Sequence, residues 1–137
     1  MRYTFKKEER LCSKRLIESL FRNGSSFVVY PYRVVVLYGE TLPTDAVPAQ
    51  CIISVSKRRF RKAVDRNAIK RRMREAYRLQ KAELYETLRE HALQGLFAFQ
   101  YIGKKQEPYV LMHERMEKAL AKLKDEYRQI YMDEHHP

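Results

Sequence analysis

The feature that most constrains this chain is a run of positive charge that directly follows a strand-like segment. Residues 57–81 contain twelve Lys and Arg but only two acids, so this window holds +10 of the chain's formal net charge of +11. Residues 50–56, just before it, alternate as a β-strand does, with Cys51, Ile53 and Val55 on one face. The pattern predicts a strand, a basic loop and a helix that gathers the positive charge into one patch.

The helix predicted from about residue 62 has two chemically different sides. At about 100° per residue, its apolar side consists of Ile69, Met73, Ala76 and Tyr77. Its opposite side consists of Lys70, Lys81, Arg74, Asn67, Arg78 and Arg71. Like charges four residues apart each cost a helix roughly 0.2–0.5 kcal/mol, so we expect a polyanion to neutralise this side. A solvated charged face is the alternative, and the near absence of acids disfavours it.

Several basic positions and one Asn form a motif in this window, Arg66-Asn67-x-x-Lys70-Arg71-x-x-Arg74-Glu75, entered from Ser54-Val-Ser-Lys57. The motif resembles the basic signature of the bacterial ribonuclease P protein subunit. Arg10-Leu11, before a short helix that ends at Phe21-x-x-Gly24, is similar to the N-terminal helix of the same family. Chain length and element order also fit, while residues 80–95 and the tail after Tyr127 match least well. The resemblance therefore covers most of the chain.

This resemblance implies a protein cofactor of ribonuclease P, an endoribonuclease that removes the 5′ leader of precursor tRNA. In that family the RNA subunit is the catalyst and uses Mg²⁺, so we expect this polypeptide to supply no catalytic residue, no metal site and no tightly bound cofactor. The implied partners are the catalytic RNA and precursor tRNA, with no membrane and no obligate protein partner. The predicted contacts with the catalytic RNA are Lys57, Arg58, Arg59, Arg61, Lys62, Arg66, Asn67, Lys70, Arg71, Arg74 and Arg78.

The resemblance also implies a cleft between the N-terminal helix and the sheet that holds the single-stranded leader. Phe21 matches an aromatic position there, Ile17 stands where many relatives have Phe, and Val35 stands nearest the family's cleft Tyr. The candidate cleft residues are Phe21, Ile17, Tyr30, Tyr32 and Val35. Taken alone, each aromatic residue favours a role in the core. Asn67 fits a first-turn helix cap as well as it fits an RNA contact.

The predicted element order is α-β-β-β-α-β-α, an α+β two-layer sandwich with a mixed four-stranded sheet. Helices are expected over 13–22, 62–95 with a break near 79–81, and 108–130, and strands over 27–30, 32–38, 50–56 and 96–102. A strand-helix-strand unit normally crosses over in the right-handed sense, whereas the resemblance implies the rare left-handed form. A single domain is predicted over 1–137, with an extended arm over 1–11 and a frayed tail over 132–137.

Composition limits the function classes. A chain of 137 residues that is 45% hydrophobic fits one folded domain, and its net charge of +11 points to nucleic acid or an anionic membrane. No apolar run approaches the roughly 18 residues of a bilayer span, and the first residues lack the apolar stretch of a signal peptide. We therefore expect a cytoplasmic protein. Its two cysteines, Cys12 and Cys51, are predicted to be buried thiols.

The remaining alternatives use the same basic patch differently. A generic structured-RNA-binding protein, ribosomal or assembly, would bind RNA with no role in cleavage. A DNA-binding protein would present the helix over 66–78 to a major groove. An independent protein nuclease is disfavoured, because the acids are scattered and His91 and His113 are isolated in sequence.

Overall fold

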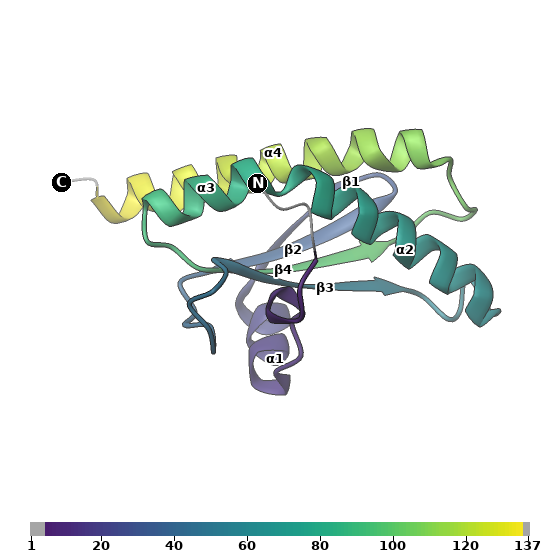
Figure 1. Ribbon diagram of the computed structural model, residues 1–137, viewed down its shortest axis with the longest axis horizontal. Coiled ribbons are helices and arrows are strands. Elements are labelled where there is room, and N and C mark those ends of the chain that lie inside the picture. Colours follow the sequence, from purple (N-terminus) through teal and green to yellow (C-terminus); the bar gives the residue numbers. More distant parts are fainter. Residues whose placement is uncertain (1–4, 136–137) are drawn as a thin grey trace.

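A mixed four-stranded sheet lies at the centre of the computed structural model, which describes residues 5–135, with side chains described to residue 127 (Figure 1). The strands are β1 (Ser25–Val29), β2 (Tyr32–Tyr38), β3 (Ala49–Val55) and β4 (Gly95–Tyr101), in the order β1-β2-β4-β3. β1 and β4 each pair with β2 in the antiparallel sense, and β3 pairs with β4 in the parallel sense. The mixed sheet expected from the sequence is therefore confirmed.

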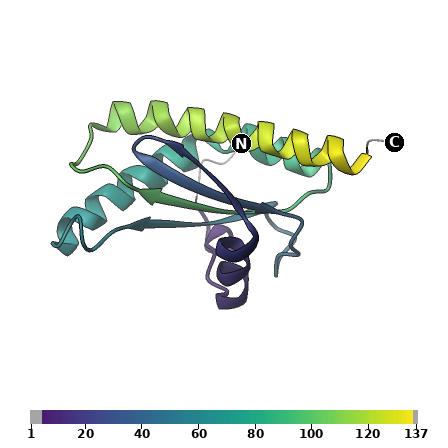
Figure 2. The same ribbon diagram turned by 180° about the vertical axis from the view of Figure 1, so that it is seen from behind.

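Helices cover the two faces of the sheet unequally. The helices α2 (Ala63–Gln80), α3 (Ala82–Glu90) and α4 (Tyr109–His135) lie on one face. Figure 2 shows α1 (Lys14–Asn23) on the opposite face, after the short 3-10 helix η1 (Lys7–Glu9). The sheet and the three helices above it form the predicted two-layer sandwich, to which α1 adds a partial layer.

The strands β3 and β4 are neighbours although two helices separate them in the chain. Val55 pairs with Tyr101, so both strands end at the same edge of the sheet. The chain passes from β3 through α2 and α3 to β4 in the left-handed sense (Figure 1), as the family resemblance implies and against the usual preference. The loops that follow β3 and β4 therefore start side by side.

Alternation along the strands divides the core into two clusters. The main cluster lies between the sheet and α2, α3 and α4, and β4 contributes to it an aromatic row of Phe97, Phe99 and Tyr101. The smaller cluster lies beneath α1 and includes Leu16, Leu20, Val35, Leu96 and Ala98. Both faces of the central strands β2 and β4 are thus largely buried, which fixes their register.

The ends of α1 are set by Ser13 and Gly24. Ser13 Oγ accepts a hydrogen bond from the Leu16 N–H at 3.3 Å and caps the start of the helix. Gly24 follows the helix with an extended backbone, φ −76°. A Cβ at Gly24 would lie 2.4 Å from the carbonyl oxygen of Leu20 and 2.8 Å from that of Val36. Glycine is required here because α1 approaches β2 closely, and not because the backbone is left-handed.

The two ends of the chain differ from the prediction. The arm over 1–11 is not extended throughout, because η1 makes a turn and Arg10 then forms a β-bridge with Cys51 at the edge of β3; residues 1–4 lie outside the described part. The tail predicted over 132–137 is helical as far as His135, and residues 136–137 are not described. Neither Gly nor Pro interrupts the chain between Tyr109 and His135, so the helix continues past its last apolar position.

The two cysteines occupy different environments. Cys51 is 2% exposed in the main core, as predicted, and burial raises the pKa of its thiol. Cys12 is exposed, so the prediction that it is buried was wrong. Its neighbour Leu11 is the residue that turns inward, into the smaller cluster beneath α1.

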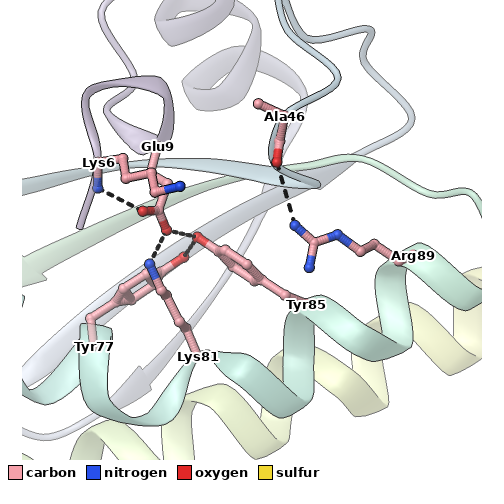
Figure 3. A network of polar contacts seen from close by, with 7 residues as sticks. All are labelled: Lys6, Glu9, Ala46, Tyr77, Lys81, Tyr85 and Arg89. Carbon is pink, nitrogen blue, oxygen red and sulfur yellow. Dashed lines mark hydrogen bonds and ion pairs between the residues drawn. The ribbon is translucent and has the colours of Figure 1, made fainter. Parts of the chain in front are cut away.

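A buried ion pair joins η1 to the junction between α2 and α3 (Figure 3). The Lys81 ammonium contacts Glu9 Oε1, and the two side chains are 7% and 2% exposed. The Tyr85 hydroxyl donates to the same oxygen at 2.8 Å and shares a second 2.8 Å hydrogen bond with Tyr77. The helix breaks at Lys81, where a break was expected, and Lys81 belongs to the core rather than to the basic face.

Replacing Lys81 tests this junction. Lys81→Ala should destabilise the fold by about 3–5 kcal/mol, because the Glu9 carboxylate would stay buried without its cation. Lys7→Ala, which removes an exposed lysine from η1, should change stability by less than about 0.5 kcal/mol. Urea unfolding followed by circular dichroism compares the two variants. A destabilisation below about 1 kcal/mol for Lys81→Ala would contradict a tightly coupled pair.

Candidate nucleic-acid interface

The helix α2 packs its apolar side on the sheet and turns its cations outward. The predicted core positions are all fully buried: Ile69, Met73, Ala76 and Tyr77. On the other side Asn67, Arg71 and Arg74 are exposed and Lys70 is half-buried. The helix begins after Lys62 with no side-chain cap, so Asn67 lies beyond the first turn. A capping role for Asn67 is therefore excluded, and its amide belongs to the outward face.

The loop over residues 57–62, called the basic loop below, holds its cations on a fixed turn. Its exposed cations are Lys57, Arg58, Arg59, Arg61 and Lys62. Phe60 anchors the turn in the main core, with its ring 5.9 Å from the Tyr101 ring in an edge-on contact. Arg66 Nη1 donates to the carbonyl oxygens of Phe60 and Arg61 at 2.7 and 2.8 Å. Arg66 thus positions the basic loop, and its charge still adds to the patch.

At the C-terminal end of α2, fewer cations are available to a ligand than the sequence predicts. Arg78 Nε donates to Glu75 Oε2 at 2.8 Å. This hydrogen bond lowers the pKa of the Glu75 carboxyl and raises the pKa of Arg78. Lys81 is buried against Glu9. The positive charge is consequently centred on the basic loop and the N-terminal half of α2, and Arg78 contributes as part of an ion pair.

Two lysines that sequence reasoning did not include lie at the same end of the sheet. Lys104 and Lys105 are exposed in the loop after β4, and Arg59 of the basic loop donates to the carbonyl oxygen of Ile102. The pair is visible in the sequence as a short basic loop. Its location depends on the parallel pairing of β3 with β4, because parallel neighbours end at the same edge of a sheet. The expected strand-helix-strand crossover already made the two strands parallel, but their direct pairing, which brings both loops together, was not predicted.

Three of the predicted cleft residues lie on or under α1. Phe21 is 45% exposed, and Ile17, one turn earlier on the same side of the helix, is half-buried. Val35 is 3% exposed in the smaller core cluster beneath α1. Phe21 and Ile17 are therefore available to a ligand, whereas Val35 supports the helix from below.

The other two predicted cleft residues lie elsewhere, which corrects the prediction. Tyr32 is fully buried on the opposite face of the sheet, where its hydroxyl donates to the carbonyl oxygen of Met112 at 2.9 Å. Side chains alternate along β2, so Tyr32 and Val35 point to opposite faces. Tyr30 is exposed in the turn between β1 and β2, and its hydroxyl donates to Glu107 at 3.4 Å. Neither residue shares a surface with Val35.

A polar row on the sheet face beside α1 was missed by the sequence reasoning. The register aligns Val28 with Arg33, Arg33 with Gln100, and Gln100 with Ser54. Arg33 Nη1 donates to Gln100 Oε1 at 2.9 Å, and Val28 is 56% exposed. A groove of about 400 Å³ runs from Ser54 and Gln100 to the basic loop. Strand alternation alone places Arg33 on this face, so the signal was present in the sequence.

The described residues form neither a cluster of potential metal ligands nor a membrane-spanning helix. Among them, no three His, Cys, Asp or Glu side chains come close enough to bind a metal ion. His91 Nδ1 lies 2.9 Å from the Thr87 carbonyl oxygen, and His113 Nδ1 lies 3.3 Å from the Tyr109 hydroxyl. Over the same part of the chain, no helix has the length and apolar character that crossing a bilayer requires. The chemical character of the surface is cationic and hydrogen-bonding.

The sequence matches a known protein family and a curated relative. The family described as Ribonuclease P matches residues 5–124. The ribonuclease P protein component of Porphyromonas gingivalis is 38% identical over 117 residues, which are 85% of this chain and 84% of that protein.

Two solved structures share the fold. The Staphylococcus aureus RNase P protein, 22% identical, covers 86% of this chain and 97% of its own with a TM-score of 0.66. A mutant of the S. aureus protein with defective mRNA degradation activity, also 22% identical, covers 86% of this chain and 90% of its own with a TM-score of 0.65. The family match spans the whole sheet, the basic loop and α2, and by that match this chain belongs to the ribonuclease P protein family.

Proposed function

We propose that this protein is the RNA-binding subunit of a ribonuclease P and assists the removal of the 5′ leader from precursor tRNA. The observation that carries the proposal is the concentration of exposed cations on the basic loop and the outward face of α2. None of these cations takes part in an ion pair within the described part of the chain: Lys57, Arg58, Arg59, Arg61, Lys62, Arg71 and Arg74. A surface of this kind suits a polyanion.

Structured RNA fits this surface better than duplex DNA does. Proteins contact folded RNA chiefly through phosphates and 2′-hydroxyls, and base edges in its deep major groove are out of reach of side chains. Arg71 and Arg74 can each fork onto two phosphate oxygens, and the Asn67 amide beside them both donates and accepts. The basic loop extends the contact beyond the helix. The catalytic RNA is the ligand we assign to this surface.

The sheet face beside α1 suits the single-stranded leader. Unpaired RNA binds aromatic side chains next to a positively charged groove. Phe21 offers an exposed ring on α1, and Arg33 offers a guanidinium on the neighbouring open sheet face. The groove from Gln100 to the basic loop links this face to the catalytic-RNA surface. A leader bound here would lie close to the RNA that cuts it.

The chemical step is assigned to the RNA subunit. The described residues include no cluster of potential metal ligands, so we derive no step of hydrolysis from this polypeptide. Mg²⁺, which would activate the attacking water and stabilise the leaving oxygen, is proposed to be held by the RNA. The protein's role is then to bind, orient and neutralise charge between two RNA molecules that repel each other.

Reconstitution tests the proposal. The protein is added to a bacterial ribonuclease P RNA with precursor tRNA at low Mg²⁺, and leader release is followed by gel electrophoresis. Faster release than with the RNA alone is expected. Binding to the catalytic RNA without faster release would favour a generic RNA-binding protein. An arm with protein alone, on precursor tRNA and on an mRNA, addresses the activity named for the S. aureus protein; cleavage there would assign chemistry to the polypeptide.

Removing two arginines from α2 should weaken binding to the catalytic RNA and reduce its salt dependence. For Arg71→Ala with Arg74→Ala, the slope of log K against log salt should fall by roughly 0.7–0.9 for each phosphate that the variant no longer binds. Lys118→Ala with Lys122→Ala removes the same charge from exposed positions on α4 and serves as the matched control. Equal slopes for both double variants would mean that the interface lies elsewhere.

Leader binding should depend on Phe21. Phe21→Ala should reduce the affinity for precursor tRNA with a long leader by about 1–3 kcal/mol, the contribution of one stacked base. Affinity for a substrate with a minimal leader should stay near the wild-type value. Val110→Ala, at an apolar residue 77% exposed on α4, is the control for general effects. An equal reduction with both substrates would assign Phe21 to the fold rather than to the leader.

A further inference from the structure

The loop between β4 and α4, residues 102–108, has a fixed conformation. The Tyr101 hydroxyl donates to the carbonyl oxygen of Lys105 at 2.6 Å and accepts from the N–H of Glu107 at 2.9 Å. A Cβ at Gly103 would lie 2.9 Å from the Tyr101 ring, so only glycine fits there without movement. Tyr101 itself is buried in the main core. The β4–α4 loop is therefore held against the end of the sheet.

Side chains tie the β4–α4 loop to α2 and to the basic loop. Gln106 Nε2 donates to Asp65 Oδ1 at 3.3 Å, and Arg72 Nη1 donates to Gln106 Oε1 at 3.4 Å. Arg59 of the basic loop donates to the carbonyl oxygen of Ile102. The β4–α4 loop consequently lies along the N-terminal half of α2, on the flank from which Asp65 and Arg72 project.

The charge of this loop is open to solvent. Lys104 and Lys105 are exposed, and neither takes part in an ion pair within the described residues. Two carboxylates on this side of the molecule are engaged: Asp65 accepts from Gln106, and Glu107 is 8% exposed and accepts from a tyrosine hydroxyl. The two ammonium groups are thus available to an anion beside the basic loop.

The two lysines lie on a different flank of α2 from Arg74. With 3.6 residues per turn, Arg72 and Arg74 project about 160° apart around the helix axis. Arg72 reaches the β4–α4 loop through Gln106, whereas Arg74 lines a groove with Arg10 at the edge of β3. Arg71 projects outward between these flanks. Cations therefore border α2 on both sides as well as along its outer face.

We propose that the catalytic RNA contacts both flanks of α2, and that Lys104 and Lys105 bind a second backbone segment, separate from the one at Arg74. This inference rests on the proposed function and adds a phosphate-binding site to it. A helix with its side chains is about 10–12 Å wide, so cations that project in nearly opposite directions face different stretches of RNA. Lysines on a fixed loop also lose less freedom on binding than lysines on a mobile one.

Charge removal on the loop gives the first test. For Lys104→Ala with Lys105→Ala, the salt slope of binding to the catalytic RNA should fall by about 1.4–1.8 if each lysine binds one phosphate. Lys118→Ala with Lys122→Ala again serves as the control and should keep the wild-type slope. Combined with Arg71→Ala and Arg74→Ala, the reductions should add, because separate RNA segments are involved. A wild-type slope for the loop variant would overturn the proposal.

Directed hydroxyl-radical cleavage gives the second test. An iron–EDTA tether on the native Cys12, which is exposed in the groove that Arg74 lines, reports the RNA at that flank. The same tether on Lys105→Cys, in a Cys12→Ser background, reports the RNA at the β4–α4 loop, and Cys51 is too buried to react. Two non-overlapping sets of cleaved nucleotides are expected, and a single shared set would overturn the proposal.

The two levels of the hypothesis fail in different ways. If the loop variant matches its control while Arg71→Ala with Arg74→Ala still weakens binding, the second site is wrong and the proposed function stands. If the wild-type protein neither binds the catalytic RNA nor stimulates leader release, the proposed function itself is wrong.

Discussion

The parallel pairing of β3 with β4 is the constraint on which the interface depends. It aligns Val55 with Tyr101, so the basic loop and the β4–α4 loop leave the sheet at the same edge. Because β3 and β4 are parallel, the chain must cross over the sheet between them, and α2 and α3 form that crossing. In this crossing α2 packs its apolar side on the sheet. Its cations point outward, at the end of the sheet where the two loops lie. One pairing thus brings together charge from two stretches far apart in the sequence, residues 57–74 and Lys104 with Lys105.

The buried pair of Glu9 and Lys81 has a complementary role at the other end of α2. It fixes the N-terminal arm to the junction of α2 and α3 (Figure 3). A buried ion pair gives little net stability, but removing one partner is costly, so it favours one arrangement of the elements over others. Here it keeps Arg10 beside Cys51 and thereby forms the groove that Arg74 lines. The N-terminal arm therefore lies beside Arg74, on the interface side of the molecule.

Local patterns in the sequence predicted most helices and strands. Most of the functional residues that were missed or misplaced depend on contacts between residues far apart in the chain. Period-2 alternation in β3 and the apolar side of α2 indicated the correct faces, because each signal lies within one element. Tyr32 was assigned to the cleft together with Val35, although alternation along β2 places the two on opposite faces, and the position of α1 decides that Val35 is on the cleft side. Lys81 was assigned to the basic face because its partner Glu9 lies 72 residues away. Lys104 was overlooked because the basic loop, which lies near it in space, follows β3, whereas Lys104 follows β4.

The contacts of the arginine side chains explain how a surface whose cations repel one another stays ordered in the free protein. Arg59 and Arg66 donate to backbone carbonyl oxygens, which stabilises their guanidinium groups and fixes the loops without neutralising them. Arg71 and Arg74 lie exposed on a helix whose other side is fully buried, so the core offsets the repulsion between them. The surface is therefore preorganised, and phosphates that bind it relieve repulsion without having to order the protein first. Arg59 and Arg66 thus hold the loops and keep their charge, while Arg71 and Arg74 face the ligand, which lets one patch be both rigid and highly charged.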